Sequence, residues 1–257
     1  MLFFIDLLNY SVTIKILKRT DLEMLKAVLF DLDGTLLPMD QEVFVKYYFG
    51  GLCKKLVPLG FDANELVKNI WAGTKAMITN NGSQTNEEVF WNYFKTVYGD
   101  DILNYQPTFE AFYQNEFQAV QQVCGFEAES ARIIKFVKDK GLRVILATNP
   151  IFPAIATQSR IKWAGLNQYD FEIITTYENS HYAKPNPKYY AEILQNAQLK
   201  PEECLMVGND VKEDMVARTL GIDVFLLTND LIADDTCDLS QYPQGDFKDL
   251  YQYLENK

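Results

Sequence analysis

Residues 28–35 of the chain read VLFDLDGT, and this stretch decides the fold. The apolar run Ala27–Phe30 predicts a strand that is buried on both faces, as in the middle of a parallel sheet. Side chains two positions apart point to the same side of a strand, so Asp31 and Asp33 can reach one space at its carboxyl end. Ligands of open α/β sheets bind at that end, and Gly34 permits a sharp turn there. The competing interpretation is a surface turn, in which Asp and Gly are also favoured.

The carboxyl-terminal half of the chain alternates between helical and strand patterns. Further strands are expected at residues 142–147, 171–176, 204–207 and 223–227. Helices are expected at residues 130–140, 151–164, 187–198, 211–220 and 246–255. Such alternation predicts right-handed βαβ units, and therefore an α/β fold with a doubly wound, mostly parallel, Rossmann-like sheet covered by helices on both faces.

The stretch between the first two strands has a different character. It is rich in Phe, Tyr and Trp, and its helical periodicity predicts helices at residues 41–56, 63–79, 86–98 and 108–124. We therefore expect an inserted all-helical domain with an aromatic core. The expected division is an amino-terminal extension at 1–23, an α/β catalytic core at 24–39 and 127–257, and the helical insertion at 40–126.

The first 23 residues do not resemble a signal peptide. The apolar run Met1–Leu8 is interrupted by Asp6 and is too short to cross a bilayer. Met24 stands directly before the buried strand, so we hypothesise that native translation starts there. Intact-mass analysis of the native protein that found residues 1–23 would refute this hypothesis.

The composition limits the classes of partner. The formal net charge of −11 argues against nucleic acid and against an anionic membrane, because no basic field attracts phosphate groups. A small phosphorylated metabolite is compatible with this charge if a metal ion supplies the positive charge. The oligomeric state is left open by the sequence.

The cysteine and histidine content excludes other kinds of site. The four cysteines lie far apart and form no Cys-x-x-Cys pair, which indicates free thiols of a reducing compartment. We therefore expect a cytoplasmic protein without a zinc site. The single histidine, His181, excludes a poly-histidine metal site and argues against a Ser-His-Asp triad.

Polar residues follow several of the expected strands, and parallel strands end at one edge of their sheet. The residues brought to this edge are Asp31, Asp33, Thr148 and Asp210. Lys184 comes from a loop that can fold over the edge, and Asp214 stands four residues after Asp210, on the same face of a helix start. Each residue has an ordinary structural interpretation alone, such as a strand end, a solvated lysine or a helix cap.

The charges of this set predict a metal site. Four carboxylates face one lysine, which would raise several carboxyl pKa values unless a cation is present. A hard divalent ion with oxygen ligands, water and substrate phosphate suits Mg²⁺. The Thr148 hydroxyl and the backbone N–H of Asn149, which we expect at a helix start, are suitable for binding phosphate.

These motifs, in their order and spacing, resemble motifs one to four of the haloacid dehalogenase-like (HAD) hydrolase superfamily. They are Asp31-Leu32-Asp33-Gly34-Thr35, the strand end at Thr148, Lys184-Pro185, and Gly208-Asn209-Asp210 with Asp214. The inserted helices resemble the C1 cap of that superfamily. The acid at Asp33 favours the phosphatase type or a phosphomutase, because true dehalogenases of the superfamily lack an acid there.

The resemblance implies a Mg²⁺-dependent hydrolase of small phosphomonoesters that acts through an aspartyl-phosphate intermediate. It implies that Asp31 attacks phosphorus and that Asp33 first protonates the leaving oxygen and then deprotonates water. Thr148, Asn149 and Lys184 would bind the phosphoryl group.

For the metal, the resemblance implies Asp31, the backbone carbonyl of Asp33, and Asp210 as ligands. Asp214 would orient metal-bound water. Three alternatives remain at this point: a phosphomutase similar to beta-phosphoglucomutase, a signalling receiver domain and a catalytically silent binding protein. The receiver domain is disfavoured by the long helical insertion. The sequence does not identify the substrate or the cap residues that select it.

Overall fold

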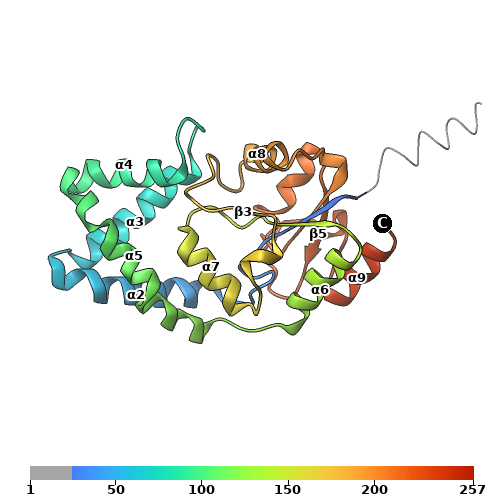
Figure 1. Ribbon diagram of the computed structural model, residues 1–257, viewed down its shortest axis with the longest axis horizontal. Helices are drawn as coiled ribbons and strands as arrows, with labels where there is room; N and C mark the ends of the chain where they lie inside the picture. Colours follow the sequence, from blue (N-terminus) through green and yellow to red (C-terminus); the bar gives the residue numbers. More distant parts are fainter. Residues whose placement is uncertain (1–24) are drawn as a thin grey trace, which may run out of the picture.

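A computed structural model describes residues 25–257 and contains one six-stranded parallel sheet in the order β3-β2-β1-β4-β5-β6 (Figure 1). The strands are β1 Ala27–Phe30, β2 Arg143–Leu146, β3 Ile173–Ile174, β4 Cys204–Gly208, β5 Asp223–Leu227 and β6 Gln244–Gly245. Every neighbouring pair of strands is parallel. The predicted α/β class with a doubly wound sheet is confirmed.

Strand β1 lies in the middle of the sheet and is fully buried. Its last residue, Phe30, is level with Leu146 of β2 and Val207 of β4. The N–H of the next residue, Asp31, still donates to the Val207 carbonyl at 2.9 Å. This register places Asp31 beside the ends of both neighbouring strands, as the sequence predicts.

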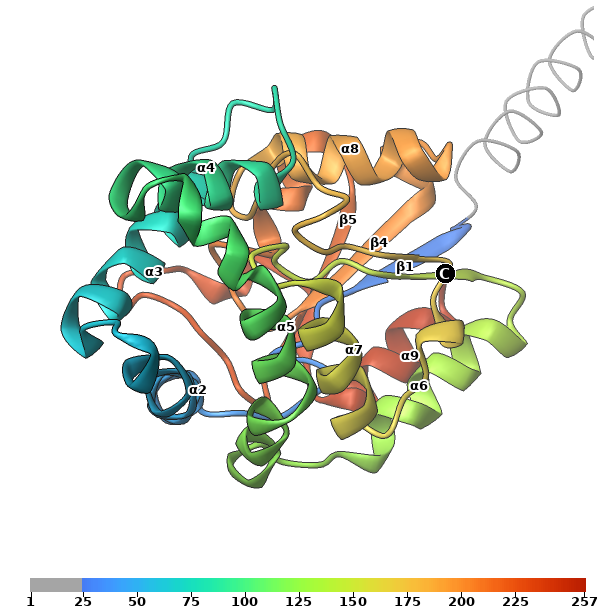
Figure 2. The ribbon, with the colours of Figure 1, turned by 60° about the vertical axis from the view of Figure 1, so that its left-hand side comes forward.

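Helices cover both faces of the sheet, as Figure 2 shows. The helices α6 Ala128–Asp139 and α9 Phe247–Glu255 pack on one face, and α8 Pro187–Ala197 packs on the other. Alternate residues of β1 pack on opposite faces of the sheet. Val28 and Phe30 belong to one hydrophobic cluster, and Ala27 and Leu29 belong to the other. This two-sided burial explains the uninterrupted apolar run.

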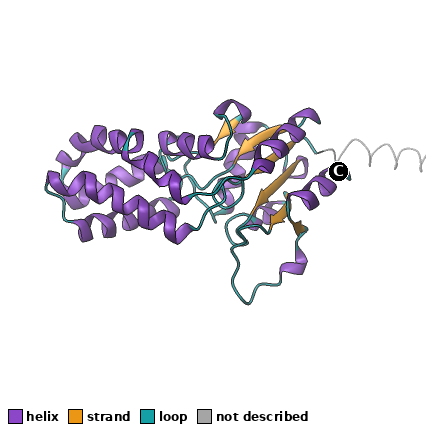
Figure 3. Ribbon diagram, turned by 90° about the horizontal axis from the view of Figure 1, so that it is seen from below, coloured by secondary structure: helices purple, strands orange, loops and turns teal. Residues whose placement is uncertain are grey.

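The insertion between β1 and β2 is helical, and Figure 3 shows it as a bundle beside the sheet domain. Its main elements are α2 Gln41–Leu56, α3 Ala63–Ile78, α4 Asn86–Tyr98, α5 Gln106–Gln114 and the 3₁₀ helix η3 Glu116–Val123. The predicted helical cap is therefore confirmed. Its core is aromatic, with Phe94, Phe112 and Phe117 fully buried.

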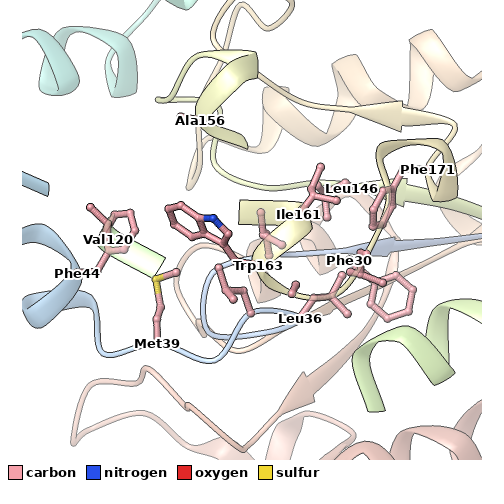
Figure 4. Packing of buried hydrophobic residues seen from close by; sticks show 14 of the residues in the cluster. Phe30, Leu36, Met39, Phe44, Val120, Leu146, Ala156, Ile161, Trp163 and Phe171 are labelled. Atoms are coloured by element: carbon pink, nitrogen blue, oxygen red, sulfur yellow. The ribbon is translucent and has the colours of Figure 1, made fainter. Parts of the chain in front are cut away.

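The larger hydrophobic cluster is continuous between the cap and the sheet. Figure 4 shows it extending from Phe30 and Leu146 past Trp163 to Phe44 and Val120 of the cap. Trp163 belongs to α7 Ala154–Trp163, which lies between the two parts. Because residues of the cap and of the sheet domain belong to the same hydrophobic cluster, the two parts pack together through apolar side chains.

Two expected helices differ from the structure. The single helix expected at 108–124 is α5 followed by η3, because the Asn115 side chain donates to the Ala111 carbonyl at 2.7 Å and the backbone leaves the α region there. Of the helix expected at 211–220, only the second part is helical, and it forms the 3₁₀ helix η6 Met215–Leu220. Residues 211–214 form turns instead, and Asp210, directly before them, accepts from the N–H groups of Lys212 and Glu213.

The strand expected at 171–176 is shorter than predicted, and one strand was missed. Only Ile173–Ile174 pairs with β2, because the following backbone leaves the sheet toward Thr176. The strand β6 is two residues long and carries no apolar alternation that a pattern could detect.

The domain boundaries at 39/40 and 126/127 remain predictions. The hypothesis of translation from Met24 concerns residues outside the described range. No helix within residues 25–257 has the length and apolar character needed to cross a bilayer.

Candidate active site

Asp31 and Lys184 form the centre of the site. Asp31 follows β1, is 7% exposed, and its Oδ1 accepts a hydrogen bond from the Lys184 ammonium group at 2.7 Å. The same ammonium group contacts Oδ1 of Asp214 at 2.6 Å. The structure therefore brings together three residues that the sequence predicted to lie at one sheet edge.

Lys184 is fully buried but remains charged. Burial alone lowers the pKa of this lysine, but Asp214 and Asp31 more than offset that effect and raise the pKa well above its usual range. Burial acts in the opposite direction on Asp214 and raises the pKa of that carboxyl, while Lys184 opposes the rise. The 2.6 Å contact between the Lys184 ammonium group and Asp214 favours the ion pair between these two side chains.

Asp33 has a separate environment. Its Oδ2 accepts a hydrogen bond from the Arg160 guanidinium, whereas its Oδ1 is buried without a hydrogen-bond partner. Burial raises the pKa of Asp33 to about 6, a rise that Arg160 opposes and Asp31 reinforces. A carboxyl group with this pKa can hold or release a proton near neutral pH.

Arg160 was missed by the sequence analysis. It belongs to α7, is fully buried, contacts Thr157 Oγ1 at 3.2 Å, and lies over the Phe152 ring at 4.5 Å from its centroid. The sequence contains no signal for it, because the helix mixes polar and apolar residues; Arg160 is buried through the packing of the helix, in which Ile161 and Trp163 are also buried. An arginine in such a helix needs an acidic partner.

Thr148 and Asn149 lie at the end of β2, as predicted, and both line the cavity beside Asp31. The Thr148 carbonyl accepts from Thr175 Oγ1 at 2.7 Å and from the Tyr189 hydroxyl at 2.8 Å, which fixes this loop. The Asn149 amide donates to Glu213 at 3.0 Å, and its Oδ1 is buried without a partner.

The expectation that Asn149 stands at a helix start is wrong. Helix α7 begins at Ala154, because Pro153 is its amino-terminal cap. The N–H of Ala154 donates to both carboxylate oxygens of Glu178, at 2.8 and 3.1 Å. The amino terminus of α7 is therefore occupied by the protein's own carboxylate.

Asp210 and Asp214 have different roles in the loop after β4. Asp210 Oδ1 accepts from the N–H groups of Lys212 at 2.7 Å and Glu213 at 2.9 Å. Asp214 is fully buried, and its Oδ2 accepts from the Asp210 N–H at 3.0 Å while its Oδ1 contacts Lys184. Both oxygens of Asp214 thus contact protein donors.

Asn209 connects the first and last motifs. Its Oδ1 accepts from Thr35 Oγ1 at 3.0 Å, and its Nδ2 donates to the Asp230 carbonyl at 2.6 Å. Gly34 has φ +85°, and a Cβ at this position would lie 2.3 Å from the Asn209 amide nitrogen. Glycine is therefore required for both the turn and the close approach.

The four predicted carboxylates line one cavity but contact different partners. Asp33 is turned toward Arg160 and Asp214 toward Lys184. Across residues 25–257, no group of three or more His, Cys, Asp or Glu side chains has an arrangement suited to holding a metal ion. The carboxylate oxygens that accept from no basic side chain are those of Asp210, the second oxygen of Asp31, Oδ1 of Asp33 and Oδ2 of Asp214, which accepts from the Asp210 N–H.

A cavity of about 310 Å³ connects this site to the cap. Its sheet-domain end is lined by Asp31, Asp33, Asp210, Glu213 and Asp214, and its other end by aromatic and aliphatic side chains of the cap helices. Glu213 was not predicted, and burial raises the pKa of its carboxyl.

A sequence model of the haloacid dehalogenase-like hydrolases matches residues 25–221. The chain belongs to this family. It is 27% identical to the glyceraldehyde 3-phosphate phosphatase of Methanothermobacter thermautotrophicus over 212 residues, which are 81% of this chain and 88% of that protein.

Solved structures share the fold of this HAD-family chain. A HAD phosphatase from Thermococcus onnurineus superposes with a TM-score of 0.58 at 18% identity, covering 90% of this chain and 98% of that one. A HAD hydrolase from Bacillus subtilis, described as bound to magnesium, superposes with a TM-score of 0.54 at 16% identity, covering 90% and 99%. The expectation of a HAD-family hydrolase with a helical cap is confirmed.

Proposed function

We propose that this HAD-family hydrolase is a Mg²⁺-dependent phosphatase that releases phosphate from small phosphomonoesters through an aspartyl-phosphate on Asp31. The main supporting observation is the geometry around that carboxylate: a charged, buried Lys184 contacts it at 2.7 Å, and Asp33 with a pKa of about 6 stands two residues away. The phosphatase activity of its relative from Methanothermobacter thermautotrophicus agrees with this proposal.

In the first step, an Asp31 oxygen attacks phosphorus, and the bond between phosphorus and the ester oxygen breaks. Asp33 donates its proton to the departing oxygen, so that a neutral alcohol leaves. Lys184 balances the charge of the phosphoryl oxygens, and Thr148 and Asn149 bind the same group. The side-chain amide of Asn149 already donates to Glu213, and its buried Oδ1 cannot bind an anion, so the backbone N–H of Asn149 would make this contact.

In the second step, water attacks the phosphorus of the aspartyl-phosphate. Asp33, now ionised, takes a proton from that water, and the bond between Asp31 and phosphorus breaks. Inorganic phosphate leaves, and both carboxyl groups return to their starting states. The same carboxyl group therefore serves as acid and then as base, which a pKa near 6 permits.

The residues at the sheet edge fit a magnesium ion. The available donors are all oxygen atoms, and the five acids of the cavity are opposed by only two basic side chains, Lys184 and Arg160. Asp31, the Asp33 carbonyl and Asp210 would hold the ion, and Asp214 would act through bound water. When bound, the ion supplies positive charge that neutralises the phosphoryl group.

The test is phosphate release from a panel of phosphomonoesters with and without Mg²⁺. We expect Asp31→Asn to lower kcat by about 10³-fold or more, because the nucleophile is lost. The matched control is Asp139→Asn, which makes the same change at an exposed position of α6. Normal turnover by Asp31→Asn would refute the proposal.

The phosphomutase alternative is separated by the same assay, because a mutase needs a bisphosphate activator and retains its phosphoryl group. Rapid phosphate release without such an activator supports the phosphatase. A silent binding protein would release no phosphate from any ester. The small phosphorylated metabolite as substrate and the cytoplasmic location remain predictions.

A further inference from the structure

The cap end of the cavity is chemically different from its acidic end. Helices α2, α3, α4 and α5 line it, and none of the side chains that they contribute is charged. Apart from tyrosine and tryptophan, the polar side chains among them are Gln41 and Thr74. The part of a substrate that reaches past the phosphate therefore meets a mainly apolar wall.

Two of the tyrosines on this wall are already bonded to each other. The hydroxyls of Tyr48 on α2 and Tyr113 on α5 lie 2.9 Å apart and share a hydrogen bond. Burial raises the pKa of Tyr48 to about 12, so the pair is neutral. Their mutual bond leaves less capacity for substrate hydroxyl groups.

No lysine, arginine or histidine is among the described residues that line the cavity. Lys184 and Arg160 lie behind it, and their charged groups contact Asp31, Asp33 and Asp214. A second anionic group on the substrate would therefore enter a cavity that is lined by five acids and by no basic side chain with which it could pair.

We propose that the cavity takes phosphate esters of small, uncharged, mainly apolar alcohols, such as arylalkyl or short alkyl phosphates. This inference rests on the proposed phosphatase function and specifies its substrate class. Sugar phosphates are disfavoured, because their hydroxyl groups would lose water without gaining enough partners. The volume of about 310 Å³ is at the lower end of the usual range for small-molecule sites, about 300–1,000 Å³, which indicates a small leaving group.

Trp71 of α3 is the residue that best tests this assignment. It lines the cavity and is also 49% exposed, so it lies at the opening. Its ring is 5.5 Å from that of Phe49, in a tilted arrangement. A leaving group with a flat ring or a short chain would contact this pair, whereas the phosphate stays at Asp31.

The experiment compares benzyl phosphate and hexyl phosphate with glucose 6-phosphate and 3-phosphoglycerate, all in the presence of Mg²⁺. Benzyl, hexyl and glucose 6-phosphate are esters of primary alcohols, so differences in kcat/KM report recognition more than leaving-group reactivity. We expect kcat/KM for benzyl phosphate to exceed that for glucose 6-phosphate by about 100-fold or more.

Substitutions of Trp71 test whether the cavity wall causes the preference for benzyl phosphate. Trp71→Ala should lower the ratio of kcat/KM for benzyl phosphate over glucose 6-phosphate by about tenfold, and Trp71→Phe should restore most of it. The matched control is Tyr169→Ala, which removes an aromatic side chain that is 82% exposed and does not line the cavity. This control should keep the wild-type ratio.

A binding measurement separates this inference from the proposed function. Calorimetry with benzylphosphonate and methylphosphonate should show tighter binding of the benzyl compound, weakened by Trp71→Ala. Turnover of glucose 6-phosphate or 3-phosphoglycerate at least as efficient as that of benzyl phosphate would overturn the substrate class and leave the phosphatase intact. A preference for benzylphosphonate without turnover of any ester would support the ligand class and refute the phosphatase. The absence of both turnover and preference would overturn both proposals.

Discussion

Asp31 and Asp33 are two positions apart and yet have different chemical environments. Asp31 contacts the ammonium group of Lys184, which orients this carboxylate for attack. Asp33 contacts Arg160 with one oxygen and is buried without a partner at the other, and its pKa rises to about 6. Neighbouring carboxyl groups with different environments can thus divide the roles of nucleophile and acid.

The raised pKa of Asp33 predicts a pH dependence of stability in protein treated with a chelator. The folded state holds the Asp33 proton more tightly than the unfolded state, so this contribution is complete below pH 3.8 and is lost as the pH rises through about 6. The free energy of unfolding should fall by about 1–3 kcal/mol. This range lies below the full value of the pKa shift because 22% of the Asp33 side chain is exposed to solvent, which screens its charge. Urea unfolding between pH 4 and 7 should show this loss in the wild type and not in Asp33→Asn. Equal slopes for both proteins would contradict the assignment.

Arg160 predicts a second effect, because it is a buried cation with an acidic partner. Arg160→Met removes that partner from Asp33 and should lower the free energy of unfolding by about 3 kcal/mol at pH 7. The double variant Asp33→Asn/Arg160→Met leaves no unpaired charge and should recover part of this loss. Denaturant unfolding of the four proteins in the cycle measures the coupling. Additive effects of the two substitutions would show that the ion pair contributes nothing.

The contrast between Lys184 and Arg160 explains what the sequence could predict at this site. Lys184 stands in a loop beside a proline, and strand-end geometry brings Asp31 and Thr148 to the same edge, so their meeting follows from the topology. Arg160 lies in the last turn of α7, and only the tertiary packing of that helix turns its side chain toward Asp33. Helical periodicity alone assigns such an arginine to the surface.

At the scale of whole elements, the amino terminus of α4 joins the cap to two loops of the site. Asn86 is fully buried, and its side chain donates to the carbonyls of Pro150 at 3.1 Å and Tyr182 at 3.2 Å. Its backbone N–H donates to the Ser180 carbonyl at 2.9 Å. The loop after Thr148 and the loop before Lys184 are therefore both held by one residue of the cap.

This connection predicts the effect of Asn86→Ala. The substitution removes the side-chain donor to two carbonyls and one of the two hydrogen bonds that the Asn80 amide donates, and should lower the free energy of unfolding by about 1–3 kcal/mol. It should also raise KM several-fold, because the phosphate-binding loops lose their common support. Urea unfolding and steady-state kinetics measure the two effects. Asn81→Ala is the control, since the Asn81 side chain bonds only locally to Ser83. Identical behaviour of the two variants would exclude this role for Asn86.

Element boundaries were predictable where local chemistry fixes them. Helix α4 begins and ends as predicted, because Thr85 and Glu88 form a capping box and Gly99 follows its last residue. The break after Gln114 was not predictable in the same way, since it depends on the contact that Asn115 makes with Ala111. The strand β6 is held by pairing with β5 rather than by its own pattern.

For the whole molecule, cap position and site chemistry are connected through aromatic packing. Phe152, beside the loop after β2, contacts Tyr48 and Phe44 of the cap, with ring centroids 5.6 and 6.3 Å apart. Phe117 of the cap packs on Trp163 at 5.0 Å. Any opening of the cap must separate such pairs, so substrate entry and the apolar contact between the two parts compete.

The charge of the molecule leads to a prediction about metal removal. With a net charge of −11 and five acids at one cavity, a divalent cation should bind the folded chain and not the unfolded one. Chelation should abolish phosphate release, and Mg²⁺ should restore it. At about 100 times its Kd, Mg²⁺ should also stabilise the fold by about 2.7 kcal/mol, visible as a rise in Tm. Asp210→Asn should reduce this rise, whereas Asp235→Asn, at an exposed position, should not. A rise in Tm that is equal in wild type and Asp210→Asn would place the ion elsewhere and remove Asp210 from the proposed ligands.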